Sequence, residues 1–380
     1  MSELRLYDRS RVTTDWTCPR KRYLQYEFEG KGIVSSNTSL DLFMGTVLHD
    51  GLAGIARGLD IDLIAETARK EMFEILSKNS TGVMEEIDYA LEQSSLIEGM
   101  IRGFYRQVWP RILNQFPNIL FIEEEMQFEH DGLTFMSKPD LGVQDNDGNV
   151  AYIEYKSTGS KSEGWINGWS TAVQLHSTIK AIKATRDLDV SQVIVQGLYK
   201  GFSSYGKQSS PFCYAYFKKG QPPFSKDQLE YSYKAGLKRV PVWEMEGGVK
   251  KWVEGMPEEI LSEQFPQVPP IFINDDLINS FFKQRSFRER EIDLANGLIS
   301  HADEEARKSI LDVAFPQKFD SCSSYYGRAC EYLRICHGNV NDPLNEGWEE
   351  RVPHHQLEID QWNLKENENV EGNSDQALGI

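Results

Sequence analysis

The chain has 380 residues, enough to bury a full hydrophobic core in one large domain or two. Hydrophobic residues make up 40% of it, which argues against a disordered chain, and no apolar run reaches the roughly 20 residues that span a bilayer. The net charge of −17 argues against nucleic-acid binding over the whole surface and leaves room only for a local basic channel.

The negative charge is concentrated near the C-terminus. Residues 341–380 hold ten acidic and two basic residues, which accounts for eight of the 17 net negative charges. We expect this segment to be an acidic tail that is peripheral or partly disordered. The N-terminus lacks the apolar segment of a signal peptide, so we expect a cytoplasmic protein with reduced thiols and no membrane association.

The first segment of interest is a short helical region with a basic cluster. Residues 7–26 predict two short helices that break before Pro19, because proline is favoured at the first helical position. Arg20, Lys21 and Arg22 form a compact basic cluster at the start of the second helix. This cluster is interpreted either as a DNA-binding surface or as a solvated helix end.

Three longer helices are predicted next. Residues 41–56, 61–76 and 89–116 carry apolar side chains at helical spacing, and the last helix is expected to end near Pro110 or Pro117. Gly45 and His49 lie four residues apart and therefore share one face of the first of these helices. A lone histidine at such a place is more often a structural residue than a metal ligand.

A strand is predicted over residues 119–128, with three consecutive glutamates in its middle. Glu123, Glu124 and Glu125 are typical of a solvated edge, and the sequence leaves open whether one of them faces a site. Two further strands, 133–143 and 149–156, flank a turn-forming run at 145–148. Because this run is rich in residues that tolerate turns, we expect a β-hairpin.

The second hairpin strand carries a carboxylate and an ammonium group on one face. Side chains alternate along a strand, so Glu154 and Lys156 point to the same side. Asp140 lies on the neighbouring strand. Carboxylates can hold a divalent cation that activates water, and a nearby lysine stabilises negative charge, as phosphodiester hydrolysis requires. Taken alone, such a match also arises by chance.

The remaining pattern predicts a mixed sheet. A helix over 169–185 carries Gln174, a strand covers 190–200, and its expected partner is 212–218. Strand, helix and strand in this order indicate a crossover connection, so we predict an α/β fold with a mixed central β-sheet flanked by helices. Residues 226–301 are predicted to be mostly helical.

The five cysteines are grouped in a way that favours a metal over disulfides in a reducing compartment. Cys18 lies near the N-terminus, and Cys322, Cys330 and Cys336 fall within fifteen residues of one another. Four thiolates suit either a [4Fe–4S] cluster or tetrahedral zinc. Cys213 is predicted to be a small core residue.

Four of the stretches described above occur in a characteristic order: Gly45-Thr46-Val47-Leu48-His49, Pro139-Asp140, Glu154-Tyr155-Lys156 and Gln174. On these residues the chain resembles the PD-(D/E)xK nuclease superfamily, specifically its RecB-like exonuclease branch with a restriction-endonuclease-like core. It departs from that branch at Thr178, four residues after Gln174, where members of the branch often have a tyrosine.

The cysteines extend the resemblance to iron–sulfur members of this branch, of the AddB and CRISPR-associated types. Those proteins are similar in having one N-terminal cysteine beside a proline and three near the C-terminus. The resemblance implies a [4Fe–4S] cluster, with zinc as the alternative, on Cys18, Cys322, Cys330 and Cys336. The seven-residue gap between Cys322 and Cys330 is wider than the gap typical of these relatives.

The resemblance also implies a role for each site residue. Mg²⁺ or Mn²⁺ is expected on His49, Asp140 and Glu154, with the backbone carbonyl of Tyr155 as a further ligand. Lys156 is expected to orient the attacking water or stabilise the transition state, and Gln174 to support the site. DNA contacts are expected from Arg20, Lys21 and Arg22.

The implied organisation is one RecB-like nuclease domain over residues 1–340, followed by the acidic tail at 341–380. Within this domain we expect a core at about 40–220, a helical insertion at about 225–301 and a cysteine segment at 318–338 that joins the two ends of the domain.

The implied function is metal-dependent exonucleolytic cleavage of single-stranded DNA ends in recombination, repair or phage DNA processing. The resemblance is to stand-alone bacterial or phage members, because the chain lacks the GxxxxGK[ST] loop of a helicase, which would then be a separate partner. Two alternatives stay open. One is a non-hydrolytic DNA-binding or assembly subunit, and the other is a zinc-stabilised structural protein whose D…ExK match is accidental.

Overall fold

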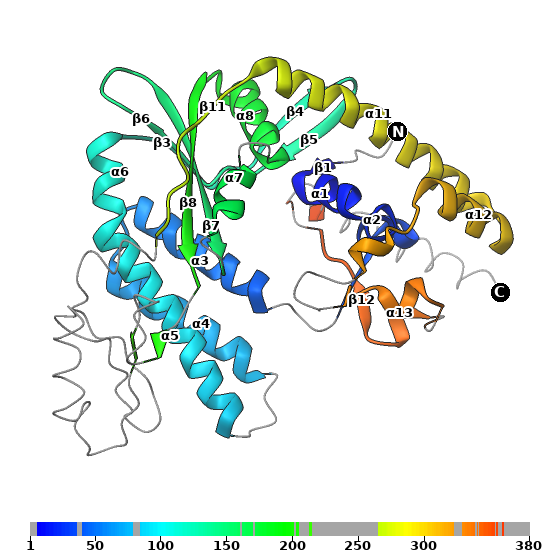
Figure 1. The fold of residues 1–380 in the computed structure, drawn as a ribbon, viewed down its shortest axis with the longest axis horizontal. Coiled ribbons are helices and arrows are strands. Elements are labelled where there is room, and N and C mark those ends of the chain that lie inside the picture. The colour runs from blue at the N-terminus through cyan, green and yellow to red at the C-terminus, as the bar shows by residue number, and fades with distance from the viewer. Residues whose placement is uncertain are drawn as a thin grey trace, which may run out of the picture.

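The structure is a computed structural model that describes residues 6–35, 40–78, 84–159, 162–169, 172–200, 203–204, 213–214, 265–322, 329–338, 340, 342–353, 355 and 359–360 (Figure 1). Among these residues, no helix has both the length and the apolar character needed to cross a membrane.

Among the described residues, the four helices α3–α6 are followed by the five strands β3–β7, and further helices and strands lie on either side of this block. The helices are α1 (Arg9–Thr17), α2 (Pro19–Tyr26), α3 (Leu40–Ala56), α4 (Ile61–Lys78), α5 (Met84–Gln107), α6 (Trp109–Gln115), α7 (Glu163–Gly168), α8 (Val173–Arg186), α11 (Asp275–His301), α12 (Glu304–Ala314) and α13 (Leu333–Cys336). The strands are β1 (Leu6–Asp8), β2 (Ile33–Ser35), β3 (Asn118–Ile122), β4 (Met126–His130), β5 (Leu133–Ser137), β6 (Leu141–Gln144), β7 (Val150–Thr158), β8 (Val190–Tyr199), β9 (Ser203–Ser204), β10 (Cys213–Tyr214), β11 (Ile271–Phe272) and β12 (Trp348–Glu350). Short 3-10 turns are η1 (Phe28–Gly30), η3 (Phe319–Ser321) and η4 (Pro343–Asn345).

The central sheet has five strands in the order β11-β8-β7-β6-β3. β7 pairs in parallel with β8 and antiparallel with β6, so the sheet is mixed, as predicted. Parallel neighbours need a crossover connection, and α7 and α8 supply it between β7 and β8. The α/β fold class and the crossover helix are therefore confirmed.

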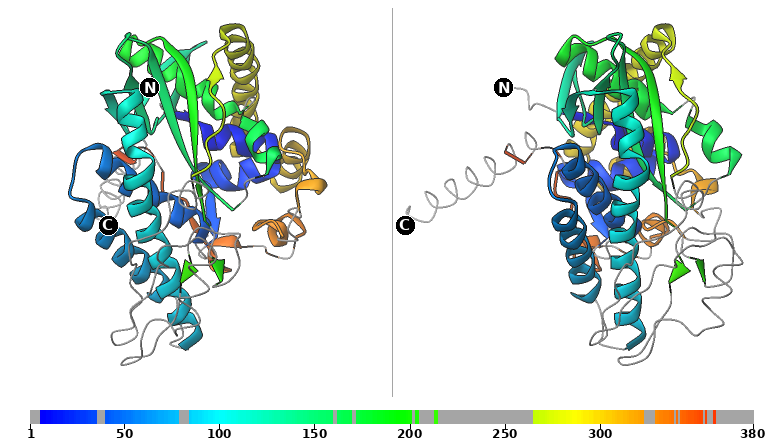
Figure 2. Two further views of the ribbon diagram at one scale, coloured as in Figure 1. Left: turned by 60° about the vertical axis from the view of Figure 1, so that its left-hand side comes forward. Right: turned by 90° about the vertical axis from the view of Figure 1, so that its left-hand side faces the viewer.

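Both faces of this sheet are covered by helices. Ile153 and Tyr155 of β7 pack into one core with α3, α4, α5 and α6, and Figure 2 shows the long α5 (cyan) beside the strands. Tyr152, on the opposite face, packs with Leu175 of α8 and Phe282 of α11. This alternation is what the period of two predicts for a strand buried on both faces.

Two strands that the sequence predicts as continuous are each divided between two sheets. The predicted strand 119–128 is divided into β3, in the central sheet, and β4, in a small sheet of order β1-β5-β4. The predicted strand 133–143 is divided into β5, in the small sheet, and β6, in the central sheet. The physical reason is local, because Pro139 has no amide hydrogen and Glu123 has a left-handed φ of 47°. The Glu123 amide donates to the Asp140 carbonyl over 2.9 Å, so the two breaks lie side by side.

Other boundaries also differ from the predictions. The predicted helix 89–116 is two helices, α5 and α6, with Pro110 in the first turn of the second. β10 pairs with β9 and not with β8, whose neighbours are β7 and β11. Residues 215–264, which include much of the expected insertion, lie outside the described residues, as does the side chain of Cys213.

A third packed region joins the two ends of the chain. Tyr23 and Leu24 of α2 share a core with Phe315, Tyr332 and other apolar residues from the C-terminal third. β12 pairs antiparallel with β2, and its Trp348 is buried. The segment after residue 341 is therefore not peripheral throughout, since burial of this tryptophan ties it to the N-terminal part of the chain.

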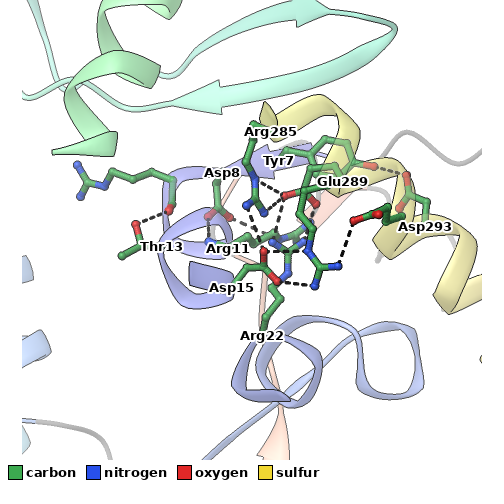
Figure 3. Close-up of polar contacts among 12 residues, drawn as sticks. Tyr7, Asp8, Arg11, Thr13, Asp15, Arg22, Arg285, Glu289 and Asp293 are labelled. Atoms are coloured by element: carbon green, nitrogen blue, oxygen red, sulfur yellow. Dashed lines mark hydrogen bonds and ion pairs between the residues drawn. The ribbon is translucent and has the colours of Figure 1, made fainter. Parts of the chain in front are cut away.

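Buried ion pairs fasten α1 and α2 to α11 (Figure 3). Glu289 accepts hydrogen bonds from Arg22 Nη2 at 3.1 Å and from Arg285 Nε at 2.8 Å. Asp15 accepts from Arg285 Nη1 at 3.2 Å and from Arg288 Nε at 3.1 Å. Burial opposes the charge on Arg22, but Glu289 and other acidic neighbours hold its pKa above the usual value. This network fixes the position of α1, which begins at Arg9.

Candidate metal centre

Three metal-ligating side chains converge beside the central sheet. His49 comes from α3, whose Val47 and Leu48 are buried against the sheet. Its Nδ1 lies 3.1 Å from Asp140 Oδ1 and 3.6 Å from Glu123 Oε1. One ligand atom from each of the three residues lies within 4.8 Å of the others.

The local charges keep both carboxyl groups of this trio ionised. Burial alone would raise the pKa of Asp140, but the charge and hydrogen bond of His49 and the charge of Lys156 hold it below its usual value. Burial opposes ionisation of Glu123 in the same way, and the neighbouring side chains of His49 and Lys138 hold its pKa below the usual value. Burial would lower the pKa of His49, yet Asp140 and Glu123 raise it to about 9. The trio thus concentrates negative charge around one imidazole.

Glu154 lies beside this trio and is surrounded by donors. The side chain is 1% exposed. Its Oε1 is 2.5 Å from Lys156 Nζ, 2.9 Å from Arg9 Nη1 and 3.2 Å from Gln174 Nε2. Glu154 and Lys156 therefore share one side of β7, as their spacing predicts, and α8 presents Gln174 to the same carboxylate.

The donor set fits a divalent cation. Carboxylate oxygens are the ligands that Mg²⁺ and Mn²⁺ prefer, and one imidazole is compatible with Mn²⁺. Glu123 Oε1 is buried and accepts no hydrogen bond from any described residue, as expected of an oxygen whose partner is an ion.

Comparison with known proteins agrees with this geometry. Residues 9–337 match the family model of the PD-(D/E)XK nuclease superfamily. The chain belongs to this superfamily. Because the match covers most of the chain, the α/β fold with its mixed sheet is that of a PD-(D/E)XK nuclease, an enzyme type that works with Mg²⁺ or Mn²⁺.

Other comparisons are weak. No curated protein matches the chain. Among solved structures, the crystal structure of protein VC1899 from Vibrio cholerae is 9% identical, with a TM-score of 0.18. The match covers 62% of this chain and 53% of that protein, so the chain spans about half the length of the protein that it matches.

Two further motif residues of the nuclease have clear positions. The Tyr155 backbone amide donates to Asp140 Oδ2 over 2.7 Å, which orients that carboxylate, whereas the role of its carbonyl stays a prediction. Thr178 occupies the position of the frequent tyrosine. It is buried, and its hydroxyl is 2.8 Å from that of Ser137, so it connects α8 to β5.

Sequence reasoning missed two residues of this site. The sequence does not distinguish Glu123 from the two glutamates that follow it as a candidate site residue. In the structure, Glu124 pairs with Arg186, and Glu125 lies 3.3 Å from a nitrogen of His355. Only the break of the strand at residue 123 distinguishes it. Arg9 carries no sequence signal, because α1 reaches the site through tertiary packing.

The segment that carries Cys322 lies against the N-terminal region that carries Cys18. The Ser321 hydroxyl donates to the Thr17 carbonyl over 2.9 Å, which brings the cysteine segment against the α1–α2 junction at Cys18. The Cys330 amide donates to the Cys322 carbonyl over 2.8 Å. Burial raises the pKa of Cys336 to about 11, with Arg20 opposing and the thiols of Cys330, Cys18 and Cys322 adding to the rise. All four thiols are half-buried.

The three basic residues at 20–22 do not form one surface. Arg22 is buried in the ion network and is 1% exposed. Arg20 Nη2 is 2.7 Å from Asp312 Oδ1, and Lys21 Nζ is 2.9 Å from Glu331 Oε1. The predicted basic cluster is corrected in this respect, because Arg22 serves the packing of α2 on α11.

Proposed function

We propose that the chain is a metal-dependent deoxyribonuclease, an exonuclease that degrades single-stranded DNA from its ends in recombination, repair or phage DNA processing. The observation that carries this proposal is the placement of the Glu154–Lys156 pair beside the His49, Glu123 and Asp140 trio. The intact site favours hydrolysis over a non-hydrolytic DNA-binding or assembly subunit. A separate helicase partner is part of the proposal.

Each side chain has a role in this reaction. A divalent cation, held by Asp140, Glu154 and His49, would activate water and polarise the phosphate. Lys156, with its Nζ 2.5 Å from Glu154, stabilises the negative charge that develops on the phosphate. Gln174 orients the Glu154 carboxylate through its amide. Arg9 is one-third exposed at this site and binds a backbone phosphate through its guanidinium.

Digestion of end-labelled DNA tests the proposal. Linear single strands, linear duplexes and circular single strands are incubated with Mg²⁺ and with Mn²⁺. We expect linear single strands to be degraded fastest and circles to resist. Rapid cutting of circles would instead identify an endonuclease, and degradation of duplexes alone would contradict the strand preference.

We further propose that Cys18, Cys322, Cys330 and Cys336 hold a [4Fe–4S] cluster. The contact between the segment that carries Cys322 and the α1–α2 junction at Cys18, together with the half-burial of all four cysteines, supports this. Thiolates are the ligands of such clusters. A cluster here would close a loop of some three hundred residues, and metal binding of this kind stabilises the folded state.

Replacing Cys18 by serine is expected to remove the cluster. Anaerobically purified wild type should be brown, with absorbance at about 400 nm and about four iron atoms per chain. Cys18→Ser should lose the colour and the iron and unfold at a lower temperature, whereas Cys213→Ser should keep all three properties. Colourless protein with one zinc per chain would contradict the cluster and support the zinc alternative, with the nuclease proposal unaffected.

A further inference from the structure

The turn between β3 and β4 holds Glu123 in a strained backbone conformation. Its φ is 47°, in the left-handed region, which is unfavourable for a non-glycine residue. The surrounding structure imposes this conformation, because the Glu123 amide donates to the Asp140 carbonyl over 2.9 Å. Strain of this kind persists where a side chain must be aimed at a functional site.

The strained turn directs the Glu123 carboxylate at His49 and Asp140. Oε1 is buried, 3.6 Å from His49 Nδ1, and has no hydrogen-bond donor among the described residues. Oε2 is 2.6 Å from Lys138 Nζ, which orients the carboxylate and leaves Oε1 for another partner. In an octahedral Mg²⁺ or Mn²⁺ site, neighbouring ligand atoms at about 2.1 Å from the ion are about 3–4 Å apart, and the distances from His49 Nδ1 to Asp140 Oδ1 and to Glu123 Oε1, 3.1 and 3.6 Å, lie in this range.

The charges around Glu154 separate it from this trio. Its Oε1 faces Lys156, Arg9 and Gln174, so two cations already offset its charge. A free divalent cation that approaches the trio meets two carboxylates, the imidazole of His49 and the ammonium of Lys138, whereas at Glu154 it meets one carboxylate beside an ammonium and a guanidinium. The electrostatic attraction therefore favours the side that holds Glu123.

We propose that Glu123 is a ligand of the catalytic cation and that His49, Glu123 and Asp140 bind this cation before DNA arrives. This inference rests on the proposed metal-dependent function and adds a residue that the motif pattern does not assign. Glu154 retains its interaction with Lys156 and Arg9 until substrate phosphate offers these two cations another partner.

Binding of Mn²⁺ to DNA-free, metal-depleted protein tests this inference without any cleavage assay. Calorimetry, or the loss of the free Mn²⁺ signal in electron paramagnetic resonance, gives the affinity. We expect E123Q to weaken Mn²⁺ binding by at least about tenfold, since even changes to the partners of metal ligands cost about 10- to 100-fold. E124Q is the matched control and should bind as wild type does, because Glu124 pairs with Arg186 away from the site.

A second variant tests whether misfolding of E123Q could explain a loss of Mn²⁺ binding. E123G removes the carboxylate, and glycine adopts a positive φ without steric cost, so this variant should fold and still lose Mn²⁺ affinity. If E123Q and E123G bind Mn²⁺ as tightly as wild type while D140N does not, Glu123 is not a ligand, and the proposed nuclease stands. If D140N also binds as wild type does, both the inference and the proposed metal site are wrong.

Discussion

Replacing Lys156 by alanine is expected to lower the rate of DNA cleavage by about 10²–10³-fold, the usual cost of removing one group that stabilises transition-state charge. Lys156 lies on the same side of β7 as Glu154, next to the cation site. Alanine removes the ammonium group and leaves the backbone of β7 unchanged. Single-turnover cleavage of saturating labelled DNA measures this effect separately from binding.

Glu154→Gln should lose at least as much activity. Glutamine keeps the size of the side chain and its hydrogen bonding, but it removes the negative charge that faces Lys156 and Arg9 and that the proposed cation site needs. Lys183→Ala is the control, since Lys183 pairs with Asp189 on the surface. Far-ultraviolet circular dichroism and DNA-binding affinity should stay near wild type in all three variants. Wild-type cleavage rates in Lys156→Ala or Glu154→Gln would contradict the assigned site.

Replacing Glu289 by alanine is expected to lower the free energy of unfolding by about 3–5 kcal/mol, the usual effect of breaking a buried ion pair. Glu289 is 0% exposed and accepts hydrogen bonds from both Arg22 and Arg285 (Figure 3). Its removal leaves two buried guanidinium groups with too few acceptors. Urea denaturation followed by circular dichroism measures the loss.

Glu291→Ala provides the comparison for this experiment. Glu291 is exposed on the same helix and lies 3.4 Å from Arg288, so its loss should cost about 0–1 kcal/mol. Replacing Glu289 and Arg285 together by methionine should recover part of the stability, because Glu27 still pairs with Arg22 and Asp15 with Arg288. Equal midpoints for Glu289→Ala and Glu291→Ala would show that the network does not stabilise the fold.

Local patterns predicted the parts of the site that depend on local geometry. The period of two along β7 placed Glu154 and Lys156 on one side, and the strand–helix–strand order predicted the crossover that brings Gln174 to them. The sequence contains the proline and the glutamates at which the two predicted strands are interrupted. Their consequence, which is the division of each strand between two sheets, depends on how those sheets pack.

Long-range packing explains what sequence reasoning missed. Arg22 appeared as part of an exposed basic cluster, yet its partner Glu289 lies 267 residues away and buries it. Arg9 reaches Glu154 across 145 residues, and β12 pairs with β2 although its surroundings in the sequence are acidic. No local period encodes such contacts, because they arise only when distant helices and strands pack together.

The most direct test of the metal-dependent nuclease is cleavage of end-labelled linear single-stranded DNA by wild type and by Asp140→Asn, each with Mg²⁺ and with a chelator. Asp140 accepts a hydrogen bond from the Tyr155 amide and contacts His49, so it is central to the cation site. We predict cleavage by wild type with Mg²⁺ and none in the other three reactions. Cleavage by Asp140→Asn at the wild-type rate, or by wild type in the presence of the chelator, would contradict the account.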